Sequence, residues 1–82
     1  MKYHVELKPK AIKDLSRLPK EAILQLVSRL ELLEENLHGD IKKLTNYSPE
    51  YRMRTGNYRV LFDVENNHVT VYRILHRKEA YR

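Results

Sequence analysis

The chain has 82 residues and a net charge of +5, with 41% apolar and 33% charged residues. It is too apolar for a disordered chain, and no apolar run approaches the roughly 18 residues of a membrane-spanning helix. It lacks cysteine, which excludes disulfides and thiolate metal sites, and its first ten residues lack the apolar segment of a signal peptide. We therefore expect a single cytoplasmic domain over residues 1–82.

The first half of the chain predicts a strand and a helical hairpin. Residues 2–7 alternate apolar and polar side chains, as a strand does. Pro9 suits the first turn of a short helix, and Pro19 ends that helix and opens the next. Residues 20–38 then form one long helix, which is stopped by Gly39. Its apolar stripe comprises Ile23, Leu26, Val27, Leu30, Leu33 and Leu37.

The second half predicts three strands joined by tight turns. Residues 40–50 are expected to form a loop with a short apolar anchor. Strand-like runs follow at 51–55, 57–65 and 68–76, separated by turn residues at Gly56 and Asn66–Asn67. The element order βααβββ predicts an α+β fold, in which the helical hairpin packs on one face of an antiparallel sheet.

Basic residues concentrate toward the C-terminal end. Residues 51–82 hold 7 Lys and Arg against 3 Asp and Glu, whereas residues 1–50 hold 9 against 8. Six of the eight arginines lie in the later segment. Because the planar guanidinium of arginine binds phosphate in a bidentate manner, this segment predicts an anionic partner, either nucleic acid or an acidic protein.

Two-residue turns at Thr55–Gly56 and Asn66–Asn67 would decide which side chains share a face of the sheet. On that register Arg52 lies opposite Arg59, although like charges there destabilise a sheet. One interpretation is that this is an ordinary polar face exposed to solvent. Because its charges have a single sign, we favour the other interpretation, a phosphate-binding site. A slip by one residue would exchange the two faces. The predicted outer face carries Arg52, Arg54, Arg59, Leu61, Tyr72, Ile74 and His76, whereas Leu75 and Arg73 fall on the core side.

Two spaced motifs, "YRMRTGNYRVLF" and "ILHRKEAY", together with the element order, resemble the RelE/ParE toxin superfamily over essentially the whole chain. The resemblance implies a toxin of a type II toxin–antitoxin system, neutralised by a cognate antitoxin. RelE-like members are ribosome-dependent endoribonucleases that cleave mRNA in the ribosomal A site, and ParE-like members inhibit DNA gyrase. The "HRKEAY" ending favours the RelE-like branch, whose partners are a RelB-like antitoxin, the ribosome and mRNA.

Carried onto this sequence, the resemblance also implies a set of site residues. Arg77 would protonate the leaving oxygen, and Tyr81 would act as a base or stack on a nucleobase. The implied catalytic residues are Arg59, Arg77 and Tyr81, and the implied RNA-binding residues are Lys43, Arg52, Arg54 and His76. A further arginine that some relatives carry in the preceding loop falls near Thr45 here, and Lys43 would substitute for it. No metal and no cofactor is expected, because the 2′-hydroxyl of the RNA itself is the nucleophile.

Three questions stay open at this point. His76 is a candidate acid–base catalyst because histidine is the side chain suited to proton transfer near neutral pH, but a strand-end histidine that contacts backbone or antitoxin is the alternative. A ParE-like gyrase inhibitor would cause DNA breaks and no mRNA cuts. A non-catalytic module that only binds an antitoxin would use the same arginines for an acidic segment of its partner.

Overall fold

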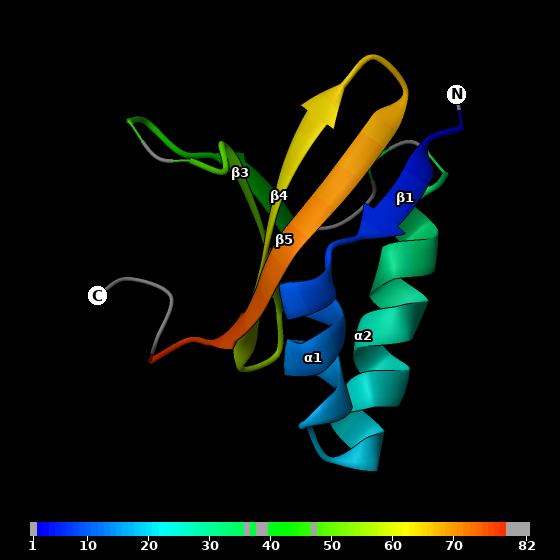
Figure 1. The fold of residues 1–82 in the computed structure, drawn as a ribbon, viewed down its shortest axis with the longest axis vertical. Helices are drawn as coiled ribbons and strands as arrows, with labels where there is room; N and C mark the ends of the chain where they lie inside the picture. The colour runs from blue at the N-terminus through cyan, green and yellow to red at the C-terminus, as the bar shows by residue number, and fades with distance from the viewer. Residues whose placement is uncertain (1, 36, 38–39, 47, 79–82) are drawn as a thin grey trace.

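The computed structural model describes residues 2–35, 37, 40–46 and 48–78. Two helices lie on one side of a five-stranded sheet (Figure 1), so the expected α+β fold with a helical hairpin on one face is confirmed. The elements are β1 (His4–Leu7), α1 (Pro9–Ser16), α2 (Lys20–Leu33), β2 (Asp40–Lys43), β3 (Tyr51–Thr55), β4 (Tyr58–Glu65) and β5 (His68–His76).

The helical hairpin begins as the sequence predicts and ends earlier. Pro9 occupies the first turn of α1, where its missing N–H costs no hydrogen bond, and Pro19 is the N-cap of α2. The predicted end at residue 38 is wrong, because α2 stops at Leu33. Beyond it the N–H of Glu34 bonds to the carbonyl three residues earlier, which tightens the backbone out of α-helical geometry.

The sheet has the strand order β1-β5-β4-β3-β2. β1 pairs with β5 in parallel, and the other three pairs are antiparallel. A loop was expected at residues 40–50. This prediction is wrong for residues 40–43, which form the edge strand β2. β2 is a short edge strand with the sequence DIKK and therefore carries two adjacent lysines. Short length and lysine side chains are common features that protect an exposed sheet edge from aggregation.

The core lies between the helices and the sheet. α1 packs against β5, and α2 lies over β3. The fully buried side chains come from both helices and the three central strands: Ala11, Leu26, Leu33, Met53, Val60, Phe62, Val69 and Val71. Among the described residues no helix covers the opposite face of the sheet (Figure 1).

The first hairpin turns one residue later than expected. Gly56 and Asn57 form the loop, and Gly56 has a φ of +58°, at the first central position where type II′ turns use glycine. Arg54 therefore pairs with Arg59, whereas the predicted pairing partner of Arg59 was Arg52. Because the pairing shifts by two residues, every side chain of β3 and β4 stays on its predicted face.

The second hairpin contains a β-bulge that the sequence analysis missed. The turn at Asn66–Asn67 and the pairing of Phe62 with Val71 are as predicted, but Leu61 then pairs with Arg73. Tyr72 is the extra residue of the bulge, so Tyr72 and Arg73 both stand opposite Leu61.

The bulge reverses the predicted faces for the rest of β5. Ile74, expected on the outer face, pairs with Val60 and is buried in the core. Leu75, expected in the core, pairs with Arg59 on the outer face. Arg73 was predicted on the core side and instead stands opposite Leu61.

Candidate functional site

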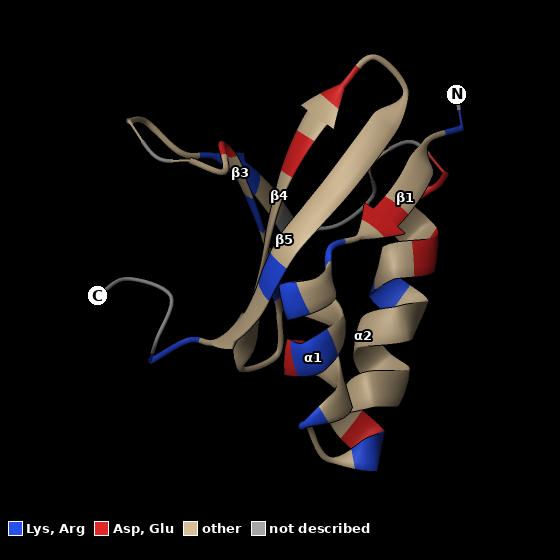
Figure 2. Cartoon of the chain, in the orientation of Figure 1, with Lys and Arg blue, Asp and Glu red and all other residues tan. Residues whose placement is uncertain are grey.

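Basic side chains gather on the sheet face that the helices leave uncovered. Lys42 pairs with Arg52 across β2 and β3, and Arg54 pairs with Arg59 across β3 and β4. Figure 2 shows the basic segments along β3. We call the surface formed by Lys42, Arg52, Arg54 and Arg59 the arginine face. It confirms the predicted convergence of Arg52, Arg54 and Arg59, and adds Lys42, which the analysis of the sequence overlooked because β2 was taken for a loop.

Two of these arginines are buried. Arg52 is 8% exposed and Arg59 is 7% exposed, whereas Arg54 and Lys42 are exposed. A buried guanidinium loses the hydration that stabilises its charge, so its position has to be maintained by the surrounding structure. Such fixed donors are what an anion-binding site requires, because they need no reorganisation when the anion arrives.

Few interactions within the described residues offset the cost of burying the charged side chain of Arg59. One Nη1–H donates to the carbonyl of the preceding Tyr58 at 3.0 Å, while the buried Nε–H has no hydrogen-bond partner. Within the described residues no carboxylate lies within ion-pair distance of it. A buried charged donor without an acceptor costs more than 1 kcal/mol. An external anion on the arginine face would supply the missing acceptor.

The acidic residue Asp63 lies at one end of the same face. Its Oδ1 accepts a hydrogen bond from the backbone N–H of Glu50 at 2.6 Å, which ties the residue before β3 to β4. Ser48, Pro49, Asp63 and Tyr72 line a surface depression beside this tie. Tyr72 is 37% exposed and follows the buried Val71, so ordinary strand alternation places it on the outer face. Tyr72 was expected on the outer face, and its position there is confirmed.

Two predicted RNA-binding residues lie elsewhere. Lys43 pairs with Tyr51 on the face opposite the arginines, and its ammonium lies 3.9 Å from a carboxylate oxygen of Glu50. His76 was predicted beside the arginines, and that placement is wrong because of the bulge. It pairs with Tyr58 instead, their rings meeting edge to face with centroids 5.6 Å apart. Its Nδ1 accepts the backbone N–H of Lys78 at 3.2 Å.

The predicted catalytic residues of the C-terminal segment are only partly described. The backbone N–H of Arg77 donates to the carbonyl of Asn57 at 2.7 Å, which places Arg77 beside the first hairpin turn. Arg54 and Arg59 flank the same turn, so the exposed side chain of Arg77 starts at their end of the sheet. Tyr81 lies outside the described residues.

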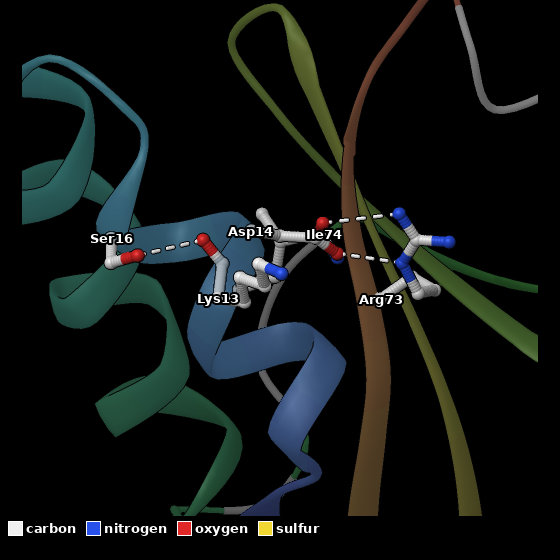
Figure 3. A network of polar contacts seen from close by, with 5 residues as sticks. All are labelled: Lys13, Asp14, Ser16, Arg73 and Ile74. Carbon is white, nitrogen blue, oxygen red and sulfur yellow. Dashed lines mark hydrogen bonds and ion pairs between the residues drawn. The ribbon is translucent and has the colours of Figure 1, made fainter.

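A carboxylate on α1 fixes the strand that carries this segment. Asp14 accepts hydrogen bonds from Arg73 Nε at 2.7 Å, Arg73 Nη2 at 3.1 Å and the backbone N–H of Ile74 at 3.0 Å (Figure 3). Burial raises the pKa of Asp14, but the hydrogen bonds from Arg73 and Ile74 outweigh it and bring the pKa below its usual value. The ionised carboxylate therefore holds β5 just after the bulge.

The described residues contain neither a metal-binding cluster nor a membrane-spanning helix. In the described part of the chain, no cluster of three His, Asp or Glu residues is arranged to hold a metal ion. Nor is any described helix long and apolar enough to cross a membrane.

Comparison with known proteins places this geometry in a family. A model of the ParE toxin of type II toxin–antitoxin systems matches residues 5–81. Toxin RelE3 of Methanocaldococcus jannaschii is 34% identical over 79 residues, covering 85% of each chain. The chain belongs to the RelE/ParE toxin superfamily. Putative toxin RelE1 of the same organism is 31% identical over 88 residues, covering all of this chain and 98% of the relative.

Solved structures assign this superfamily member to the RelE-like branch. The RelB–RelE antitoxin–toxin complex from Methanococcus jannaschii contains a chain with 32% identity and a TM-score of 0.76, covering 92% of this chain and 93% of that one. The archaeal RelE–RelB complex from Pyrococcus horikoshii gives 26% identity and a TM-score of 0.79, covering 98% and 100%. The protein is thus a RelE-like toxin of a type II toxin–antitoxin system.

Proposed function

We propose that this RelE-like toxin is a ribosome-dependent endoribonuclease that cleaves mRNA in the ribosomal A site and thereby inhibits translation in the cytoplasm. The observation that carries the proposal is Arg59, a buried arginine on an open, basic sheet face with no described carboxylate partner. A phosphate of RNA is the anion that fits a planar guanidinium donor of this kind. Membership of the RelE-like branch supports the same substrate.

The chemistry needs no metal ion. The 2′-hydroxyl of the RNA attacks the adjacent phosphorus, and the bond from phosphorus to the 5′-oxygen of the next nucleotide breaks. The products are a 2′,3′-cyclic phosphate and a 5′-hydroxyl. A base takes the proton from the 2′-hydroxyl, an acid gives one to the leaving oxygen, and fixed positive charge stabilises the phosphorane.

The family resemblance supports a role for each residue, and for the described arginines their positions on the sheet agree with it. Arg59, with Arg52 and Arg54, stabilises the charge that develops on the phosphorane. Arg77, at the same end of the sheet, protonates the leaving oxygen. Tyr81 acts as the base or stacks on a nucleobase. His76, on the opposite face and in contact with Tyr58, is left without a role in catalysis.

The limited set of general acid–base groups on this face suits an enzyme that needs the ribosome. The ribosome would hold the mRNA in a geometry suited to attack, and positioning of this kind supplies much of the rate in many enzymes. A RelB-like antitoxin would neutralise the toxin, as the RelB–RelE complexes among its structural relatives suggest.

The test uses purified toxin, programmed ribosomes and mRNA, and the ends of the mRNA are mapped by primer extension. The wild-type protein is expected to cut within the A-site codon and to leave free mRNA intact. Arg59→Ala, Arg77→Ala and Tyr81→Phe should each slow the cut, while Arg17→Ala on the surface of the helical hairpin is the matched control. Intact mRNA on ribosomes with wild-type toxin would refute the proposal.

A second candidate follows from the family model, which describes a ParE toxin. A ParE-like protein would inhibit DNA gyrase and cause gyrase-dependent DNA breaks. Supercoiling assays with purified gyrase and the same toxin preparation separate the two functions. Inhibition of gyrase together with intact mRNA would select this candidate, and growth arrest without either activity would point to a different target.

A further inference from the structure

The depression beside the arginine face is lined by both ring-bearing and hydrogen-bonding residues. It is lined by Tyr72, Pro49, Ser48 and Asp63, whose side chains carry an aromatic ring, a pyrrolidine ring, a hydroxyl and a carboxylate. Rings offer flat apolar surfaces, while the hydroxyl and carboxylate are hydrogen-bonding groups. A ligand that suits all four is itself flat and apolar on its faces, with hydrogen-bonding groups along its edge.

Tyr72 lies at the β-bulge of β5. Val71 and Ile74 are both buried, yet two residues separate them, so regular alternation of β5 is interrupted between them. The bulge resolves this by placing both Tyr72 and Arg73 opposite Leu61. Tyr72 lies on the outer face, whereas the guanidinium of Arg73 is bound to Asp14 on α1. Bulges are over-represented next to active sites, where they redirect a side chain. Tyr72 is 37% exposed, so part of its side chain is accessible to a ligand.

The depression adjoins the arginine face. Leu61 stands opposite the bulge on one side and opposite Arg52 on the other. Two strand spacings separate the backbone of Tyr72 from that of Arg52, which is about 10 Å. One short single-stranded oligonucleotide can therefore contact both, with a phosphate on the arginines and a base in the depression. Basic grooves flanked by aromatic side chains are the usual means of binding single strands.

Asp63 adds chemical selectivity. One of its carboxylate oxygens already accepts the N–H of Glu50 at 2.6 Å, which leaves the other oxygen to accept a further hydrogen bond. A carboxylate accepts hydrogen bonds from an exocyclic amino group, as it does from N4 of cytosine. Uracil presents a carbonyl oxygen at that position, and two acceptors repel. The depression is therefore suited to a base with an amino group.

We propose that Tyr72, Asp63, Ser48 and Pro49 form a nucleobase subsite that binds one base of the mRNA and favours cytosine, adenine or guanine over uracil. The base stacks on the ring of Tyr72, and its amino group donates to Asp63. This inference rests on the proposed function and deepens it, because it assigns a base preference to one position near the cut. Tyr72 and Asp63 are substrate-binding residues and take no part in proton transfer.

The substitution Asp63→Asn tests the selectivity directly. Asparagine keeps a carbonyl oxygen for the N–H of Glu50, but it replaces the second acceptor by an amide donor. The donor pairs with the carbonyl of uracil and not with an amino group. The variant should therefore reverse the preference between cytosine and uracil at one position. A merely structural role of Asp63 would lower the rate for all bases alike.

The experiment measures cleavage on ribosomes programmed with mRNAs in which each position within three nucleotides of the cut is varied in turn. At one position the wild-type toxin is expected to cut cytosine about tenfold faster than uracil, and Asp63→Asn should invert that ratio. Tyr72→Ala should slow cleavage about tenfold, and Tyr72→Phe should recover most of the loss because it keeps the ring. Val27→Ala, at an exposed apolar position on α2, is the matched control.

The outcomes separate the subsite from the proposed function. If wild-type toxin leaves ribosome-bound mRNA intact, the proposed function fails and the subsite fails with it. If wild-type toxin cleaves but shows equal rates for cytosine and uracil at every position, or Tyr72→Ala cleaves as fast as wild type, only the subsite is overturned. Thermal melting checks the fold, and if Asp63→Asn does not fold, the pair Tyr72→Ala and Tyr72→Phe decides.

Discussion

Asp14 on α1 and Arg73 on β5 are joined by two hydrogen bonds, at 2.7 and 3.1 Å, although 58 residues separate them in sequence. The Asp14 side chain is only 13% exposed, and the same carboxylate accepts the N–H of Ile74. This contact joins the helical layer to β5 directly after the bulge. It therefore fixes the part of the strand that leads to Arg77.

Asp14→Asn is expected to destabilise the fold. The amide cannot accept from both Arg73 and Ile74 with a full negative charge, so charge-assisted hydrogen bonds are lost. The expected cost is about 2 kcal/mol in the free energy of unfolding, or roughly 10 °C in the melting temperature of a domain of this size. Urea denaturation measures the first quantity and thermal melting the second.

The matched control for that substitution is Glu35→Gln. Glu35 forms an ion pair with Lys2 at 3.8 Å, but both side chains are well exposed. Exposed pairs of this kind contribute about 0–1 kcal/mol. An Asp14→Asn effect no larger than that of Glu35→Gln would show that the contact between α1 and β5 does not stabilise the fold.

The same carboxylate gives stability a defined pH dependence. The pKa of Asp14 is lowered in the folded state, so the folded protein binds this proton less readily than the unfolded chain. The stabilisation is therefore complete above the unfolded pKa, about 3.9, and is lost as the pH falls through the lower folded value. The stability gap between wild type and Asp14→Asn should be constant from pH 7 to about 5 and should narrow below about 4. A gap that widens on acidification would contradict this assignment.

Lys42 and Lys43 provide a matched pair for the RNA-binding surface. They are adjacent in sequence, both exposed, and on opposite faces of β2. Lys42→Ala should weaken binding of a short single-stranded RNA and reduce the slope of log affinity against log salt by about 0.7, the value for one phosphate contact. Lys43→Ala should leave the slope unchanged. Fluorescence anisotropy over a range of salt concentrations measures both, and equal effects of the two substitutions would contradict the arginine face as the binding surface.

Much of the site was predictable from the sequence because alternate residues of a strand lie on the same face of the sheet. An error of two residues in the pairing therefore leaves each side chain on its predicted face. The first hairpin was predicted with its turn one residue too early, yet the pairing moved by two residues and Arg52, Arg54 and Arg59 kept their common face. The helical hairpin followed from the spacing of apolar residues and from Pro9 and Pro19. Local patterns of this kind remain visible without any knowledge of long-range contacts.

The bulge could not be predicted in the same way. The segment from Val71 to Ile74 allows regular alternation or one extra residue, and only packing of Ile74 in the core selects the second. That choice moves His76 away from the arginines. β2 was missed because four residues with two lysines carry little strand signal without their partner β3. The role of Asp14 was not visible either, because it depends on a contact with Arg73 far along the chain.

The most direct test of the central claim, that Arg59 serves RNA cleavage and not folding, is a comparison of wild type with Arg59→Met in two measurements. Methionine fills a similar volume without a charge to desolvate, so the free energy of unfolding should be unchanged or rise by about 1 kcal/mol. The rate of mRNA cleavage on programmed ribosomes should fall about 100-fold or more, as expected when one fixed donor is removed from a developing charge. A stable Arg59→Met protein that cleaves as fast as wild type would contradict the account.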